Sequence, residues 1–153
     1  MDLPVTARSR NLYAGVFLGL GSIAFLDEVV FHQLLHWHHF YDKSSGSMGL
    51  VSDGLFHAFS WFATVAGLLI VVGLVRDAKF AKLTFAAGML TGAGFFQLYD
   101  GLVQHKLLGL HQIRYGVPLL PYDVVWNVVA TVMLAAGITL WATTGRMQRR
   151  RES

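Results

Sequence analysis

Apolar residues fall in four long runs along the chain, separated by short polar segments. The runs cover residues 11–35, 54–75, 80–104 and 122–143, and each is close to the ~20 residues that a helix needs to cross the hydrocarbon core of a bilayer. Little sequence remains outside them for a soluble domain. The pattern predicts an all-α fold, a polytopic membrane four-helix bundle that forms a single transmembrane domain over residues 1–153.

Composition and charge support this fold class. The chain is 54% hydrophobic and 14% charged, and it has no cysteine, which excludes disulfides and thiolate ligands. The charged residues in "FLDEVVFHQLLH" stand where a cleavable segment would have its small-residue site, which argues against a signal peptide. Nine of the twelve Lys and Arg residues lie before the first run, in the segment 76–82 where the second run gives way to the third, or after the fourth. The positive-inside rule therefore predicts that both termini are cytoplasmic, with the basic tail 144–153 as a topology anchor rather than a nucleic-acid arm.

The chain repeats itself at an offset of 73 residues. "AGVFLGLG" (14–21) aligns with "AGMLTGAG" (87–94), and ten of the 29 positions from 14 to 42 match their counterparts. We predict two tandem helical hairpins, over about 11–75 and 80–143, that arose by duplication and point the same way in the membrane. The matches include ionisable residues: Asp27 with Asp100, His32 with His105, and His38 with His111.

Glycines recur at the same spacing in both repeats. Small residues four apart allow two membrane helices to approach closely, and lipid supplies no hydrophobic drive between helices. We expect the first and third spans to pack together through these glycines, in their cytoplasmic halves. The glycines are Gly15, Gly19 and Gly21 in the first repeat and Gly88, Gly92 and Gly94 in the second.

Polar side chains reach one depth in all four spans. At 1.5 Å per residue, His32 lies about 33 Å from Arg10 along the first helix, at the outer boundary of a ~30 Å core. Asp53 and Asp123 stand at the same level where the second and fourth spans begin. Ionisable groups at membrane depth are costly unless they find partners or a cation. The sequence therefore predicts a polar site just beneath the extracytoplasmic surface.

Imidazoles and carboxylates without sulfur are typical ligands of Zn²⁺, Fe²⁺, Mn²⁺ or Cu²⁺. Along the first span Glu28, His32, His36 and His39 step by four, four and three residues, which places them on one line of a regular helix. We expect a transition metal bound first by His32, His57 and His105. The next candidates are Glu28, Asp27, Asp100 and His36.

Three other interpretations stay open. The Asp and His residues could pair only with one another and lock the bundle, and His36, His38 and His39 with Trp37 could form an interfacial belt. A b-type haem between His32 and His105 is less favoured, because acids lie within a turn of each histidine. A metal-dependent hydrolase with a lipid substrate is the alternative to metal handling, although no catalytic residue is assigned.

Three strings carry a family resemblance: "GLGSIAFLDEVVFHQLLHWHHFYD", "SDGLFHAFSWFATVAGL" and "FQLYDGLVQHKLLGLHQIR". Over about residues 12–143 the chain resembles the bacterial membrane-protein family catalogued as domain of unknown function 2243. The resemblance implies a four-span inner-membrane protein but no established activity. It carries over these positions: Asp27, Glu28, His32, His36, His38, His39, Asp53, His57, Asp100, His105 and His111.

Such proteins are similar in setting to factors that assemble respiratory oxidases. The resemblance therefore suits metal handling or the maturation of a metalloprotein on the outer face. The expected partner is the lipid bilayer. A membrane metalloprotein such as a respiratory oxidase, or a second copy of the chain through the helix seams, is a further candidate, and no nucleic acid is expected.

Overall fold

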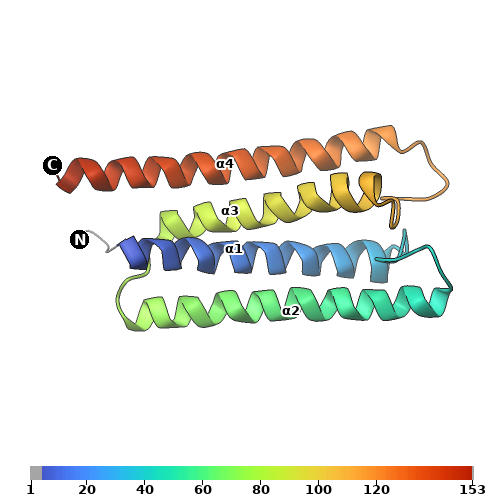
Figure 1. The fold of residues 1–153 in the computed structure, drawn as a ribbon, viewed down its shortest axis with the longest axis horizontal. Coiled ribbons are helices and arrows are strands. Elements are labelled where there is room, and N and C mark those ends of the chain that lie inside the picture. Colours follow the sequence, from blue (N-terminus) through green and yellow to red (C-terminus); the bar gives the residue numbers. More distant parts are fainter. Residues whose placement is uncertain (1–4, 153) are drawn as a thin grey trace.

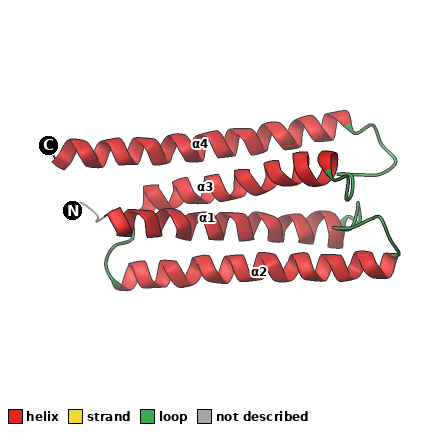
Figure 2. Cartoon of the chain, in the orientation of Figure 1, coloured by secondary structure: helices red, strands yellow, loops and turns green. Residues whose placement is uncertain are grey.

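Four long helices run side by side in the computed structural model, which describes residues 5–152 (Figures 1 and 2). The first and third helices each end in a wider, π-helical segment. In chain order the elements are α1 (Val5–Asp27), η1 (Glu28–Leu34), α2 (Gly46–Arg76), α3 (Lys82–Tyr99), η2 (Asp100–Leu107) and α4 (Leu120–Glu152). The predicted all-α fold with four helices is confirmed, and α4 continues through most of the basic tail.

The helices lie in a row with the order α2, α1, α3, α4 (Figure 1). Among the described residues, α1 and α3 pack on each other at the centre, while α2 packs on α1 and α4 packs on α3. The arrangement is thus a flat layer rather than a bundle closed on itself. Both termini and the α2–α3 loop lie at one end, and the two longer loops lie at the other.

Within the described chain, three helices are long and apolar enough to cross a membrane: Thr6–Leu34, Gly46–Arg76 and Leu120–Met147. The prediction of four such spans differs at α3. This helix lies between α1 and α4, and its buried positions are mainly small or polar, which lowers its apolar content. The outer helices instead expose large apolar side chains, as lipid contact requires. Examples are Leu55, Phe62, Leu69, Val125 and Val132.

Glycines form the seam between α1 and α3, as predicted. A Cβ on Gly15 would lie 2.1 Å from the Phe85 oxygen, and one on Gly88 would lie 2.2 Å from the Leu12 oxygen. Gly19 and Gly92 meet the partner helix at the same 2.2 Å. The third glycine of each set differs from the prediction. Gly21 and Gly94 contact the outer helices α2 and α4.

The chain turns back at the ends of η1 and η2. Backbone bonds of π type close both segments, from Leu35 N to the Val30 oxygen (2.9 Å) and from Leu108 N to the Val103 oxygen (2.8 Å). A left-handed residue follows each, His36 with φ 49° and Gly109 with φ 55°. The first helix therefore ends before His36. This contradicts the prediction of a regular helical line through His36 and His39, because the loop folds back over the helix end.

Candidate metal centre

Four buried histidines meet where α1 and α3 end. His32 lies in η1 and His105 in η2, while His38 and His111 lie in the loops that follow. None of the four is more than 5% exposed. The rings of His38 and His111 stack with centroids 4.5 Å apart at 8°, and those of His105 and His111 lie 4.6 Å apart. His32 completes the cluster, 4.5 Å from His38.

Backbone carbonyls orient two of these rings. His38 Nδ1 donates to the Ile113 oxygen (3.0 Å), and His111 Nδ1 donates to the Phe40 oxygen (2.8 Å). These two bonds are related by the same offset of 73 residues as the sequence repeat. A ring that donates from Nδ1 is left with a lone pair on Nε2, which is the usual way a protein orients an imidazole ligand.

The two loop histidines are neutral at physiological pH. Burial, reinforced by the neighbouring histidines, lowers the pKa of His38 to about 2. Burial likewise lowers the pKa of His111 to about 4. Neutral imidazole is the form that binds a metal ion. One nitrogen from each of His38, His105 and His111 lies within 4.8 Å of the others, which is close enough for one ion.

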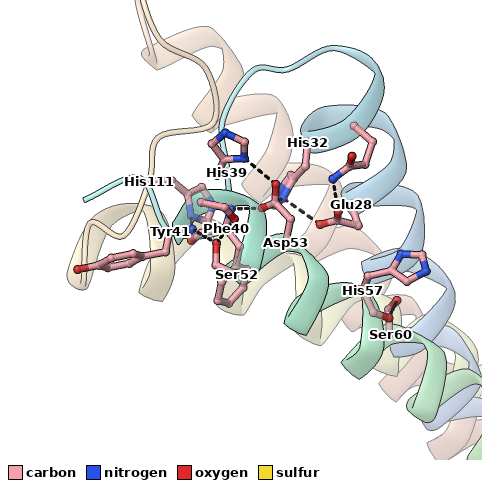
Figure 3. A network of polar contacts seen from close by, with 12 residues as sticks. Glu28, His32, His39, Phe40, Tyr41, Ser52, Asp53, His57, Ser60 and His111 are labelled. Carbon is pink, nitrogen blue, oxygen red and sulfur yellow. Dashed lines mark hydrogen bonds and ion pairs between the residues drawn. The ribbon is translucent and has the colours of Figure 1, made fainter. Parts of the chain in front are cut away.

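A second group, richer in oxygen, adjoins the first (Figure 3). It consists of Glu28, His32 and Asp53, whose ligand atoms also lie within 4.8 Å of one another. His32 Nδ1 is 3.0 Å from Glu28 Oε2 and 3.1 Å from Asp53 Oδ1. The Asp53 carboxylate is held in place by His39 Nδ1 at 2.6 Å and by the backbone N–H of Phe40 at 2.8 Å.

Several buried polar atoms in the two groups, and one in the buried Asp27, make no hydrogen bond. They are Asp27 Oδ1, Glu28 Oε2, His32 Nε2, His111 Nε2 and both ring nitrogens of His105. Asp100 Oδ2 lies 2.9 Å from His105 Nε2, but off the direction that a hydrogen bond needs. Buried polar atoms in proteins are nearly always paired. Their concentration at one place is typical of a ligand site.

The acidic part of the site has no counterpart around α3 and α4. Glu28 aligns with Gly101, where a Cβ would meet Asn127 Oδ1 at 2.6 Å. The second and fourth helices align at an offset of 70 residues, which matches Asp53 with Asp123. Asp123 pairs instead with Lys106 at 2.5 Å. The histidines thus occur in both halves of the chain, whereas the carboxylate-rich group occurs only beside α1 and α2.

The structure brings together five of the seven ligands expected from the sequence: Asp27, Glu28, His32, Asp100 and His105. His57 is exposed on α2, with its ring 5.5 Å from Phe25, and it belongs to neither group. His36 is exposed on the loop.

The structure adds three residues to the site that were not among the expected metal ligands, namely His38, His111 and Asp53. The signal for the two histidines was their alignment with each other in the repeat. For Asp53 the signal was its place at the common polar level.

A comparison with protein families gives a match to the family described as "Predicted membrane protein (DUF2243)" over residues 14–144. The chain belongs to this family. The match spans both groups of candidate ligands and confirms the resemblance seen in the sequence. Together with the apolar helices, it makes this DUF2243 protein a multi-pass membrane protein. No curated protein and no solved structure matches the chain.

An apolar pocket of 490 Å³ adjoins the histidine cluster of this DUF2243 protein. The pocket shares residues with the surroundings of the cluster, because Ile113 accepts the hydrogen bond of His38 and the Trp126 ring lies 6.0 Å from His105. Arg114 lies near the pocket rim, 4.7 Å from the Trp37 ring, and donates to the Tyr122 hydroxyl at 2.8 Å. This surface suits an apolar chain better than a polar solute.

Proposed function

We propose that this membrane protein binds a transition metal through its buried histidine cluster and handles it for the maturation of a membrane metalloprotein such as a respiratory oxidase. The observation that carries the proposal is the convergence of His38, His105 and His111 from separate segments, with ligand atoms within 4.8 Å. Imidazole nitrogens with nearby carboxylates fit Zn²⁺, Fe²⁺, Mn²⁺ or Cu²⁺. The nearest carboxylate, Asp100, lies 2.9 Å from His105 and can act as a further ligand or orient that ring.

The geometry favours an ion over haem. In a bis-histidine haem the porphyrin lies between the two axial imidazoles, so these rings cannot stack on each other. His38 and His111 are stacked 4.5 Å apart, and the other histidines lie within about the same distance of this pair. No flat slot separates the rings.

We further propose that the chain consists of two duplicated hairpins, α1 with α2 and α3 with α4, and that all four helices span the inner membrane. Two observations support the duplication: the paired bonds of His38 and His111, and the matching π-type bonds at Val30 and Val103. α3 runs alongside α1 (Figure 1), which supports the proposal that it is a fourth span. Basic residues gather at the end that holds the termini, which supports a cytoplasmic location for that end and an outer location for the proposed metal centre.

The apolar pocket supports a second candidate, a metal-dependent hydrolase that acts on a lipid. A lipid chain in this pocket would lie beside the histidine cluster, where a metal-bound water could attack an ester. Val125→Trp would fill the pocket from α4, at a position that is 64% exposed and not a ligand. A hydrolase would lose turnover in this variant with its metal content unchanged, whereas a handling protein would lose neither metal nor transfer.

Elemental analysis of protein purified in detergent, with a tag other than polyhistidine, tests the main proposal. We expect Zn, Fe, Mn or Cu in the wild type and loss of metal in His105→Ala and His111→Ala. A visible spectrum checks for a haem band. The proposal fails if the folded wild type carries no metal and takes up none of Zn²⁺, Fe²⁺, Mn²⁺ or Cu²⁺ in a titration.

A further inference from the structure

We infer that the centre holds two divalent metal ions rather than one. One ion lies among the nitrogens of His38, His105 and His111, and the other lies among Glu28, His32 and Asp53. The inference rests on the proposed function and deepens it, because it assigns the number of ions and the different chemistry of the two positions.

Buried negative charge around the cluster favours two ions. Four carboxylates are buried around the cluster, none more than 4% exposed: Asp27, Glu28, Asp53 and Asp100. Among the described residues, the ion pairs of Glu28, Asp53 and Asp100 are with histidines and not with Lys or Arg. Buried carboxylates without compensating charge are strongly unfavourable. One cation in each triad would lie beside buried carboxylates in both places, next to Asp100 at the histidine triad and between Glu28 and Asp53 at the other.

The metal-ligand atoms also fall into two separate sets. His32 faces Glu28 and Asp53 with Nδ1, so its Nε2 lies on the opposite side of the ring and makes no hydrogen bond. Glu28 is 1% exposed, yet its Oε2 also makes no hydrogen bond. Glu28 thus offers a buried ligand atom without a hydrogen bond, and His32 turns Nδ1 toward both carboxylates, at a place outside the triad of His38, His105 and His111. A single ion cannot engage both triads at bond lengths near 2 Å.

The two positions should differ in preference. Three imidazoles suit Zn²⁺, Cu²⁺ or Fe²⁺, whereas two carboxylates with one imidazole also suit Mn²⁺. The nitrogen-rich position is built from both halves of the chain. The oxygen-rich position belongs to the first half only, because Gly101 and the Lys106–Asp123 pair replace its acids in the second.

Metal stoichiometry decides the inference. The purified protein is stripped with a chelator, titrated with Co²⁺ followed by its visible spectrum, and analysed for bound metal after desalting. We expect about two equivalents in the wild type. Glu28→Gln keeps the shape of the side chain and its bond with Gln33. It should lower the metal affinity of the oxygen-rich position by a factor on the order of ten or more, while the nitrogen-rich position stays filled. His111→Ala should empty the nitrogen-rich position.

Asp123→Asn is the matched control, because it changes a carboxylate at the same level that pairs with Lys106 outside both triads. It should retain two equivalents. One equivalent in the wild type would overturn the two-ion inference and leave the proposed function standing, whereas no metal at all would overturn both. Loss of both ions from a folded Glu28→Gln protein would also overturn the assignment of separate positions. The wild-type count decides even if the alanine variant does not fold.

Discussion

Gly19 offers a direct test of how the central helices are held together. A Cβ at this position would lie 2.2 Å from the carbonyl oxygen of Met89, whereas ordinary contact begins at 3.4 Å. Gly19→Ala must therefore move the two backbones apart by about 1.2 Å. Because the obstructing atoms belong to the helix backbone, no change of rotamer relieves the contact. Overpacking of this kind costs about 1–3 kcal/mol, which lowers Tm by about 2–12 °C for a chain of this size.

The seam also positions the candidate metal centre. α1 carries His32 at its end and α3 carries His105, so a wider seam moves the two histidines apart. We expect Gly19→Ala to lower metal affinity as well as Tm. Circular dichroism during heating in detergent measures the first effect on chelator-stripped protein, and a Co²⁺ titration measures the second.

Gly54→Ala is the matched control for this change. Gly54 also lies within a helix, but no atom lies within 4 Å of the position that a Cβ would take there. The substitution should be neutral, or stabilising by up to about 1 kcal/mol through helix propensity. Our account of the seam is refuted if Gly19→Ala unfolds at the wild-type temperature and binds metal with wild-type affinity.

Three further outcomes follow from the structure. Asn11→Ala should cost about 1–3 kcal/mol in thermal unfolding, because its fully buried amide hydrogen-bonds the backbone of Lys79 and Ala81 in the α2–α3 loop. A change below 0.5 kcal/mol, within ordinary surface effects, would contradict this role. Phe56→Ala should cost about 3–5 kcal/mol, since Phe56 packs in the small core under the histidines, while Phe62→Ala on the exposed face should cost much less. In the cysteine-free chain, an impermeant maleimide should label Ser44→Cys in intact cells but Ala78→Cys only after lysis; the reverse pattern would invert the proposed topology.

Helix number and the central pairing could be predicted from the sequence because both depend on local pattern. Apolar runs of membrane length require helices, since the bilayer satisfies no backbone group. The glycine repeat then identifies which helices approach closely, and it aligns His32 with His105. Five predicted ligands meet for this reason. Apolar content alone does not decide whether α3 spans the membrane, because a helix packed on two sides needs fewer apolar residues than one that faces lipid.

The loop residues could not be placed in the same way. A regular helix through residue 39 would keep His38 on the surface, but η1 ends at Leu34 and the left-handed His36 turns the chain inward. His38 then reaches the Ile113 carbonyl, a contact between residues 75 positions apart. Neither the π-helical ending nor this long-range bond has a signature in local hydrophobicity. The same reversal leaves His36 exposed.

The position of His57 shows how one side chain changes the role of another. In the second half, Asn127 occupies the space above Gly101, where a Cβ would be only 2.6 Å from its oxygen. In the first half Glu28 stands at the position of Gly101, and His57, which aligns with Asn127 at an offset of 70 residues, is exposed with its ring 5.5 Å from Phe25. The exchange of glycine for glutamate thus accompanies the change in which helix supplies the polar group. In the proposed duplication, this exchange is the step that adds an acidic position to a shared histidine site.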